Sequence, residues 1–425
     1  MSLQDSVKTE QRLKVPFTSY DLGWVILCIG MAIGAGITFM PIQIGVKGIW
    51  VFIVAILISY TALYYMQDLY LKTLTKVKTC DNYASIITQY LGVNWGGVLG
   101  IAYFVMLLVG MLNYSMGIVN DSAAYLQSFH LADENMSQYL WYGFAIIIVM
   151  ILLANRGEKL LFKVAGPMIV VKLSIIVLLG LVMIPHWKSS NIAPMTDFLP
   201  FVRDVVLTLP FTFYSIFFAQ LLNPMNIAYR KVESDPYIAT YRAVRASRIA
   251  FIVLAIAAIF FAFSFSFSIS HAEATSALHQ NISAMGIASQ VIPGKLLHIM
   301  SVLLSVFAFI TAFLSTYLGY KEAMMGLIIN MYSRFKTDKE VNLKILSAII
   351  IIVTALGLSI WVTSNFSIMF LLQLEGPIYG FVSCLVPFIL VRKVKQLADL
   401  HSWTNYYVAF FGLLLCISPL LKFLE

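Results

Sequence analysis

The chain has 425 residues, of which 60% are hydrophobic and only 11% are charged, and its mean hydropathy is +0.87. A soluble domain of this length needs more charge to cover its surface, so the composition excludes one and indicates a polytopic membrane protein. The formal net charge of +8 would by itself suit a nucleic-acid-binding protein. The cysteines are too far apart for a disulfide framework or a zinc site of recognisable spacing: Cys28, Cys80, Cys384 and Cys416.

The predicted elements are apolar segments long enough to cross the hydrocarbon core, which takes about 20 helical residues. In chain order we predict eleven transmembrane helices, at about residues 20–44, 48–70, 95–127, 138–154, 160–185, 200–227, 246–270, 296–330, 344–364, 366–391 and 402–424. No soluble domain interrupts this series. We therefore expect an all-α fold in which residues 1–18 form a cytoplasmic tail and residues 19–425 form one transmembrane domain.

The placement of the lysine and arginine residues predicts the orientation of these helices. If the N-terminus is cytoplasmic, 22 of the 28 lysine and arginine residues fall on the cytoplasmic side and only five on the other side. This asymmetry is typical of the positive-inside rule, and eleven spans then place the C-terminus in the periplasm. The net charge is thus explained by topology, and we expect no nucleic-acid partner. Outside the membrane, residues 272–292 are predicted to form a helix near its surface.

The first span contains an unusual cluster of glycines, "GMAIGAGITFMP" at residues 30–41. A helix that breaks in mid-membrane exposes N–H and C=O groups, which is tolerated only where they line a cavity or meet a ligand. The N–H groups after such a break suit an anion such as an amino-acid carboxylate. The alternative is a small-residue packing face through Gly30 and Gly34. The candidate substrate-binding residues here are Ala32, Ile33, Gly34, Ala35 and Gly36.

The sixth span is the candidate counterpart of the first. It contains Pro210 and Pro224 around a polar and aromatic middle, "TFYSIFFAQLLNP", and proline kinks a helix. If residues 19–190 and 198–395 are inverted repeats followed by an extra helix at 402–424, spans 1 and 6 are discontinuous helices at matching positions. The alternative is a kinked helix with ordinary hydrogen bonds. The candidate substrate-binding residues in this span are Tyr214, Ser215, Ile216, Phe217 and Phe218.

Lys172 is a charged residue deep inside the fifth span. An intramembrane lysine is costly unless it is paired or loses its proton, so we expect it to carry the proton in coupling; a structural role at a helix break is the alternative. Glu375, before Gly376 and Pro377, is a weaker candidate for proton coupling, and a capping role is the alternative. Asp121, near the outer end of span 3, is expected to reach water and to be structural.

Further polar side chains in spans 3 and 8 could line a pocket, namely Asn113, Tyr114, Thr311 and Ser315. No nucleotide-binding loop, histidine pair or nucleophile elbow is present in the sequence. We therefore predict neither an enzyme nor a cofactor or metal site.

The motifs resemble those of a known family. "GMAIGAGITFMPIQIG" is similar to the span-1 signature of bacterial hydroxy/aromatic amino acid permeases, especially of their serine/threonine permease-like branch. Further similar segments follow in order: "FKVAGPM", "MIPHW", "HQNIS", "FLSTYLGYKEA" and "GPIYG". The resemblance implies the five-plus-five inverted-repeat, LeuT-like fold of the amino acid/polyamine/organocation superfamily, with proton-coupled uptake across the bacterial inner membrane. It also implies that residues 34–36 bind the substrate carboxylate and that Ser215 begins the span-6 break.

Two departures from the family pattern concern the substrate and the proton. Where serine-type members have a polar Asn-His-Ser in span 6, this chain has Phe217, Phe218 and Ala219. Thr311 occupies the position of the span-8 lysine that those members share, whereas Lys172 is similar to the span-5 lysine of some proton-coupled relatives. Our hypothesis is that the proton-carrying amine has moved to another helix while its target site has stayed in place.

Together these features predict a transporter in the inner membrane that imports a neutral amino acid, of the serine/threonine type, with a proton. The expected partners are the amino acid, the proton and membrane lipid, with no obligate protein partner. The alternatives are an aromatic amino acid:proton symporter, favoured by the phenylalanines of span 6, and a sodium-coupled amino acid transporter. An amino-acid-sensing receptor or a membrane-embedded enzyme would need a signalling domain or a catalytic cluster.

Overall fold

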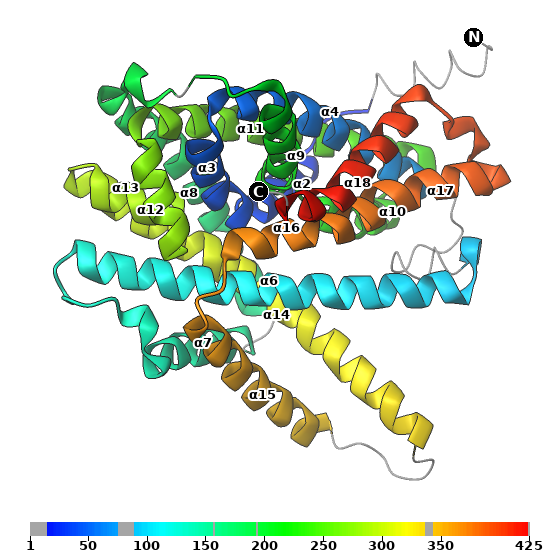
Figure 1. The fold of residues 1–425 in the computed structure, drawn as a ribbon. Coiled ribbons are helices and arrows are strands. Elements are labelled where there is room, and N and C mark those ends of the chain that lie inside the picture. The colour runs from blue at the N-terminus through cyan, green and yellow to red at the C-terminus, as the bar shows by residue number, and fades with distance from the viewer. Residues whose placement is uncertain (1–14, 75–88, 156–157, 193, 336–342, 424–425) are drawn as a thin grey trace.

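The computed structural model describes residues 15–74, 89–155, 158–192, 194–335 and 343–423. All regular elements in these residues are helical (Figure 1). The longer helices are α2 (Ser19–Ala32), α3 (Ala35–Lys47), α4 (Ile49–Leu74), α6 (Val93–Ser128), α7 (Leu140–Ala154), α8 (Glu158–Met183), α9 (Phe198–Ser215), α10 (Leu222–Val232), α11 (Pro236–Ser268), α12 (His271–Gln280), α13 (Ala284–Val291), α14 (Lys295–Phe335), α15 (Leu343–Thr363), α16 (Ile368–Tyr379), α17 (Val386–Lys393) and α18 (Trp403–Lys422). Shorter helical segments are η1 (Met136–Gln138), η2 (Ile184–His186), η3 (Ser189–Asn191), η4 (Ala219–Leu221), η5 (Gly380–Leu385) and η6 (Lys395–Leu400).

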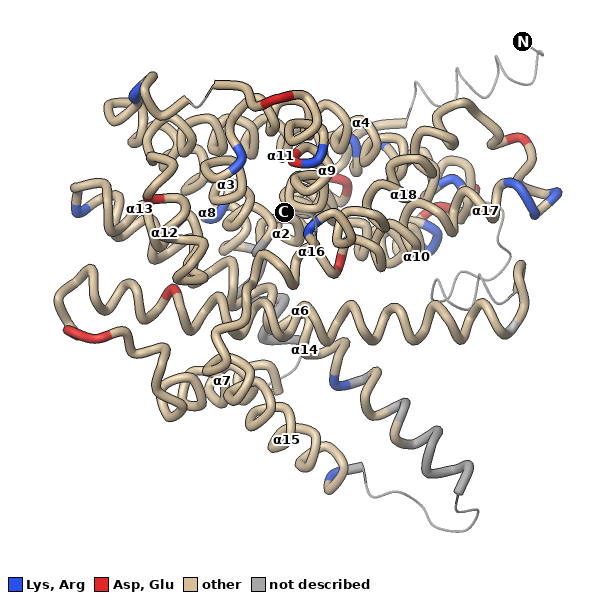
Figure 2. Tube along the Cα trace, viewed as in Figure 1, with Lys and Arg blue, Asp and Glu red and all other residues tan. Residues whose placement is uncertain are grey.

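The lengths and hydropathies of these helices confirm an all-helical membrane protein. Within the described residues, eight helices are long and apolar enough to cross a membrane, or ten if each of two bent pairs forms one span. The predicted span at 138–154 corresponds to α7, which has 15 residues and is shorter than a full span. Figure 2 shows long uncharged stretches in the helices, for example along α6 and α15. The protein is therefore a multi-pass membrane protein, whereas the count of eleven spans stays a prediction.

The two bent pairs lie where the sequence predicts interrupted helices. The axes of α2 and α3 are bent by 48°, and those of α9 and the segment that starts with η4 are bent by 43°. Gly34 connects the first pair in an extended conformation (φ −144°) and has no side chain to cap α3. The second break follows Ser215, so α9 continues through Pro210. Pro224 lies in the first turn of α10, where a missing N–H costs nothing. The prolines therefore flank the second break and do not form it.

The two breaks contact each other in the middle of the molecule. Figure 1 shows α2, α3 and α9 surrounded by the other helices. A Cβ atom added to Gly36 would overlap the carbonyl group of Tyr214, so only a glycine lets the start of α3 approach the end of α9 this closely. This close approach fixes the position of each break relative to the other.

The segment predicted as one helix at 272–292 is instead two helices, and that prediction is wrong. The chain turns at Asn281, which adopts a left-handed conformation with φ of 53°. The Asn281 side chain is buried and donates to Asn365 Oδ1 at 2.9 Å, and it accepts from Ile368 N at 3.0 Å. α12 packs on α3, and α13 packs on α14 and α6. Through these hydrogen bonds, the turn at Asn281 holds the two-helix segment against the loop between α15 and α16.

Asp121 lies beneath the two-helix segment, and the expectation that water reaches it is wrong, since only 1% of its surface is exposed. Its Oδ1 accepts from Ser283 N at 2.8 Å, and its Oδ2 accepts from Ser283 Oγ at 2.6 Å and from Ser305 Oγ. These bonds connect α6 to the first turn of α13 and to α14, and a carboxylate at a helix N-terminus is also favoured by the helix dipole. The contacts support the structural role predicted for Asp121.

A second buried charge cluster joins α2, α10 and α11. Asp21 is fully buried and accepts from Arg242 Nε and Nη2, both at 3.0 Å, and from Tyr229 Oη at 2.7 Å. Arg242 also forms an ion pair with Glu233 at 2.7 Å. A bidentate arginine–carboxylate pair with these additional partners is strong and geometrically specific. It holds the beginning of α2 against α10 and α11.

Candidate functional site

A cavity of about 180 Å³ lies beside the two helix breaks. Its wall is built from both broken pairs together with α6, α8, α14 and α16. The lining residues are Leu27, Gly30, Met31, Ala32, Ile33, Gly34, Gly36, Tyr114, Ile169, Lys172, Tyr214, Phe217, Gln220, Leu221, Thr311, Ala312, Ser315, Thr316, Leu372, Glu375 and Tyr379. Mostly apolar walls with a few convergent polar groups are typical of a small-molecule binding site.

Most of the predicted site residues line this cavity. They are Ala32, Ile33, Gly34, Gly36, Tyr114, Lys172, Tyr214, Phe217, Thr311, Ser315 and Glu375. Four others lie outside the lining. Ser215 forms a hydrogen bond with Tyr60 at 2.9 Å, and Ile216 and Phe218 are buried in the core. Asn113 donates a hydrogen bond to the lining residue Glu375. Ala35 begins α3, and its side chain lies outside the part that the structure describes.

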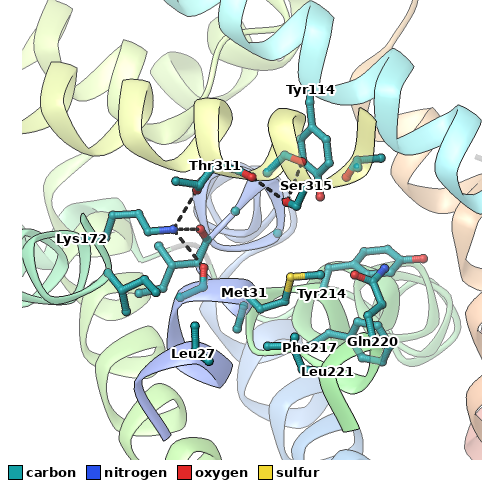
Figure 3. A pocket seen from close by; sticks show the side chains of 18 of the residues that line it. Leu27, Met31, Tyr114, Lys172, Tyr214, Phe217, Gln220, Leu221, Thr311 and Ser315 are labelled. Atoms are coloured by element: carbon teal, nitrogen blue, oxygen red, sulfur yellow. Dashed lines mark hydrogen bonds between the residues drawn. The ribbon is translucent and has the colours of Figure 1, made fainter. Parts of the chain in front are cut away.

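Lys172 extends from α8 to the end of α2 (Figure 3). Its Nζ donates to the carbonyl oxygens of Gly30 at 2.9 Å and Ile33 at 3.0 Å, and to Thr311 Oγ1 at 3.1 Å. The last carbonyls of a helix lack partners within the helix, so the break after Ala32 makes these acceptors available. Three acceptors match the three N–H donors of an ammonium group. Lys172 is fully buried and has no salt bridge among the described residues.

The other side of the first break is the N-terminus of α3. Among the described residues no side chain caps α3 at Gly34, so the first N–H groups of α3 depend on other partners. Such N–H groups, together with the helix dipole, favour a carboxylate or another anion. At this break, the end of α2 offers carbonyl groups to Lys172, and the beginning of α3 offers N–H groups.

The cavity wall opposite Lys172 is aromatic and contains a second ionisable group. The rings of Tyr214 and Tyr379 are 5.1 Å apart, and those of Phe217 and Tyr379 are 4.9 Å apart. Glu375 is 5% exposed, and its Oε1 accepts from Asn113 Nδ2 at 2.9 Å. Gln220 donates to Tyr379 Oη at 3.2 Å. This wall combines ring surfaces with hydrogen-bonding groups.

Several lining residues were not predicted as site residues, and helical spacing could have found some of them. Tyr379 and Leu372 lie four residues after and three before Glu375, on the same face of α16. Leu27 and Met31 share the face of α2 that leads to the break. Ile169 lies three residues before Lys172 and packs near Gly30. Among the described residues, no cluster of three or more histidine, cysteine, aspartate or glutamate side chains could hold a metal ion.

The fold is similar to that of a solved transporter. A mutant of the manganese transporter of Eremococcus coleocola aligns over 96% of this chain and 88% of its own, with a TM-score of 0.58 and 13% sequence identity. A scan against models of protein families finds no match. The fold and the cavity between broken helices thus define a multi-pass membrane protein with a transporter-like architecture.

Curated relatives place the chain more narrowly. A probable serine transporter of Escherichia coli K12 is 40% identical over 419 residues, which cover 98% of this chain and 95% of the relative. The threonine/serine transporter TdcC of Edwardsiella tarda is 26% identical over 98% of this chain and 99% of its own length. The serine transporter SdaC of Escherichia coli K12 is 23% identical over 93% of this chain and 92% of its own.

The chain belongs to the bacterial hydroxy/aromatic amino acid permease family, in its serine/threonine permease-like branch. This confirms the resemblance found in the sequence motifs. Since the relatives are transporters by name, the prediction that the chain is not an enzyme is also confirmed.

Proposed function

We propose that the protein imports a neutral amino acid of the serine/threonine type together with a proton across the bacterial inner membrane. The cavity at the two contacting helix breaks carries this proposal, because it places anion-binding N–H groups and a buried amine around one solute-sized space. The relatives named as serine or threonine/serine transporters support the choice of substrate. The likeness to a solved transporter over nearly the whole chain supports a transport cycle.

The proposed architecture is the five-plus-five inverted repeat, with eleven spans, broken helices 1 and 6 and an extra helix at 402–424. The positions of the two bent pairs support it, since each begins one of the proposed repeats. The lysine and arginine distribution supports a cytoplasmic N-terminus and a periplasmic C-terminus. In this orientation the Asp21–Arg242 cluster lies toward the cytoplasm, and the two-helix segment 271–291 lies toward the periplasm.

In this proposal the substrate carboxylate binds the N-terminus of α3, at Gly34 to Gly36. The absence of a capping side chain at Gly34 supports this role, because the substrate then completes the hydrogen bonding of the first turn. The lining side chains from α6, α9, α14 and α16 then surround the substrate side chain.

Lys172 carries the proton in this proposal. All three acceptors of its ammonium group are neutral dipoles, so the charge is stabilised without a carboxylate partner and can be given up. Loss of the proton weakens the bonds to Gly30 and Ile33 and thereby frees the end of α2 to move. Lys172 Nζ also donates to Thr311 Oγ1. This contact supports the hypothesis that the amine of the fifth span acts at the position where serine-type family members have a lysine in the eighth span. Entry of one proton yields about 2.3 kcal/mol per 100 mV of membrane potential, enough for modest accumulation of a zwitterion.

An aromatic amino acid is the second candidate substrate. The rings of Tyr214, Phe217 and Tyr379 favour it, because they offer stacking surfaces along one wall of the cavity.

A thermal-shift screen of the purified protein against the twenty amino acids tests the substrate proposal, with serine and tryptophan as the discriminating pair. We expect serine and threonine to raise the melting temperature in a concentration-dependent manner, because a ligand that binds only the folded state stabilises it. Stabilisation by tryptophan alone would instead support the aromatic candidate. A response to no amino acid would contradict both.

A further inference from the structure

Two oxygen atoms on the aromatic wall of the cavity, Tyr214 Oη and Glu375 Oε2, have no hydrogen-bond partner among the described residues. Tyr214 is 8% exposed, and its hydroxyl has no partner in the described structure. Glu375 is 5% exposed; Asn113 occupies its Oε1, and its Oε2 accepts no hydrogen bond from any described residue. The Tyr214 hydroxyl is buried, and a buried polar group without a partner costs about 1–3 kcal/mol, so its position requires an explanation. Here both groups line the cavity, and a bound solute would supply the missing partner.

Tyr214 lies next to the proposed carboxylate site. Tyr214 is the residue whose carbonyl group contacts the start of α3 at Gly36, so its ring begins beside the proposed carboxylate site. Figure 3 shows Tyr214 across the cavity from Lys172, with Met31 between them. The proton-carrying amine and the unpartnered hydroxyl therefore belong to different parts of the cavity.

The contact between Asn113 and Glu375 orients the carboxylate. Asn113 is 1% exposed and comes from α6, whereas Glu375 comes from α16, so the bond joins two helices that pack beside the cavity. A carboxylate oxygen accepts hydrogen bonds and, when ionised, donates none, whereas a tyrosine hydroxyl can donate or accept. A solute hydroxyl has one donor and two acceptor lone pairs, so its chemistry allows one bond to each of these groups, which line the same cavity. A methyl group in its place would leave both protein groups unpartnered.

We propose that Tyr214 and Glu375 form a recognition site for the hydroxyl group of the substrate side chain, with Asn113 as the positioning residue. This inference rests on the proposed function and adds how a hydroxy amino acid is selected. Phe217 and Phe218, which follow Tyr214, offer no side-chain hydrogen bond, whereas Tyr214 at the end of α9 and Glu375 in α16 each offer one. A site built to bond a hydroxyl discriminates strongly against an analogue that lacks it, because the buried groups then stay unpaired.

The test compares amino acids that differ only by a methyl group in place of the hydroxyl: serine with 2-aminobutyrate, and threonine with valine. Dissociation constants are measured with the purified full chain by ligand-dependent thermal shift. We expect the wild type to prefer the hydroxy member of each pair by about 100-fold or more. Tyr214→Phe, which removes only the oxygen, should lower this ratio at least tenfold. Glu375→Gln, which keeps the shape but weakens the acceptor, should lower it by about fivefold.

The matched control is Tyr125→Phe. It also removes a buried tyrosine hydroxyl, which donates to Ser301 O at 3.2 Å away from the cavity lining, and it should leave the ratio unchanged. Melting temperatures without ligand show whether each variant is folded. A wild type that binds both members of each pair equally, or an unchanged ratio in Tyr214→Phe or Glu375→Gln, would overturn this inference alone. A wild type that binds no amino acid would overturn the proposed function together with it.

Discussion

Proteoliposomes that contain Lys172→Ala should exchange external for internal serine but should not accumulate it on an imposed pH gradient. The substitution removes the group that carries the proton in the proposed cycle, while Gly34 and Gly36 and the aromatic wall stay in place. The carbonyls of Gly30 and Ile33 lose a charged donor, which costs about 1.5–3 kcal/mol per bond. Some loss of thermal stability is therefore expected beside the loss of coupling. Counterflow and gradient-driven uptake of radiolabelled serine separate the two effects.

The control for this experiment is Lys188→Ala. Lys188 is an exposed lysine in the connection that follows α8. The control therefore makes the same substitution, but at a lysine that lies outside the cavity. It should keep both exchange and accumulation. Accumulation at the wild-type level in Lys172→Ala would show that another group carries the proton, and Glu375 would then be the first to test.

Replacement of Gly36 by alanine should reduce serine transport by about 100-fold, because displacement of a binding group by even 1 Å costs that much in rate. The added Cβ would overlap the backbone carbonyl of Tyr214, which cannot rotate away as a side-chain end could. The start of α3 and the end of α9 must then separate, so the carboxylate site and the aromatic wall no longer fit one substrate. Initial uptake rates, normalised to the amount of protein in the membrane, measure the effect.

Gly23→Ala serves as its control. Gly23 lies in α2, thirteen residues before Gly36, and a Cβ there meets no atom within 4 Å. Alanine also has a higher helix propensity than glycine, by about 0.8–1.0 kcal/mol, so stability should be unchanged or slightly increased. Wild-type transport by Gly36→Ala would contradict the close contact between the two breaks.

The position of the bend between α2 and α3 could be predicted from the sequence because its cause is local. Gly34 and Gly36 lie close together in an otherwise apolar span, and glycine destabilises a helix. These two residues are sufficient to predict where the helix is interrupted. Lys172 was found for a similar reason, since a charged residue in the middle of an apolar segment is conspicuous. Its acceptors, Gly30, Ile33 and Thr311, were not predictable, because each is about 140 residues away along the chain.

Other features depend on packing that no local pattern reveals. Asn113 and Glu375 are 262 positions apart, and either could have bonded its own helix. Asp121 was expected to reach water, but the turn at Asn281 lets α13 cover it. Pro210 was expected to kink the sixth span, and it lies inside α9, which continues as far as Ser215. In each case the outcome depends on a partner element distant in sequence.

We propose that protons, through Lys172, and not sodium ions drive serine uptake. The direct measurement is serine uptake into proteoliposomes of the wild-type protein under three conditions: a pH gradient that is alkaline inside, a sodium gradient at equal pH, and no gradient. We predict accumulation above the external concentration with the pH gradient in sodium-free buffer, and only equilibration in the other two. Accumulation that requires the sodium gradient, or equilibration under all three conditions, would contradict proton symport.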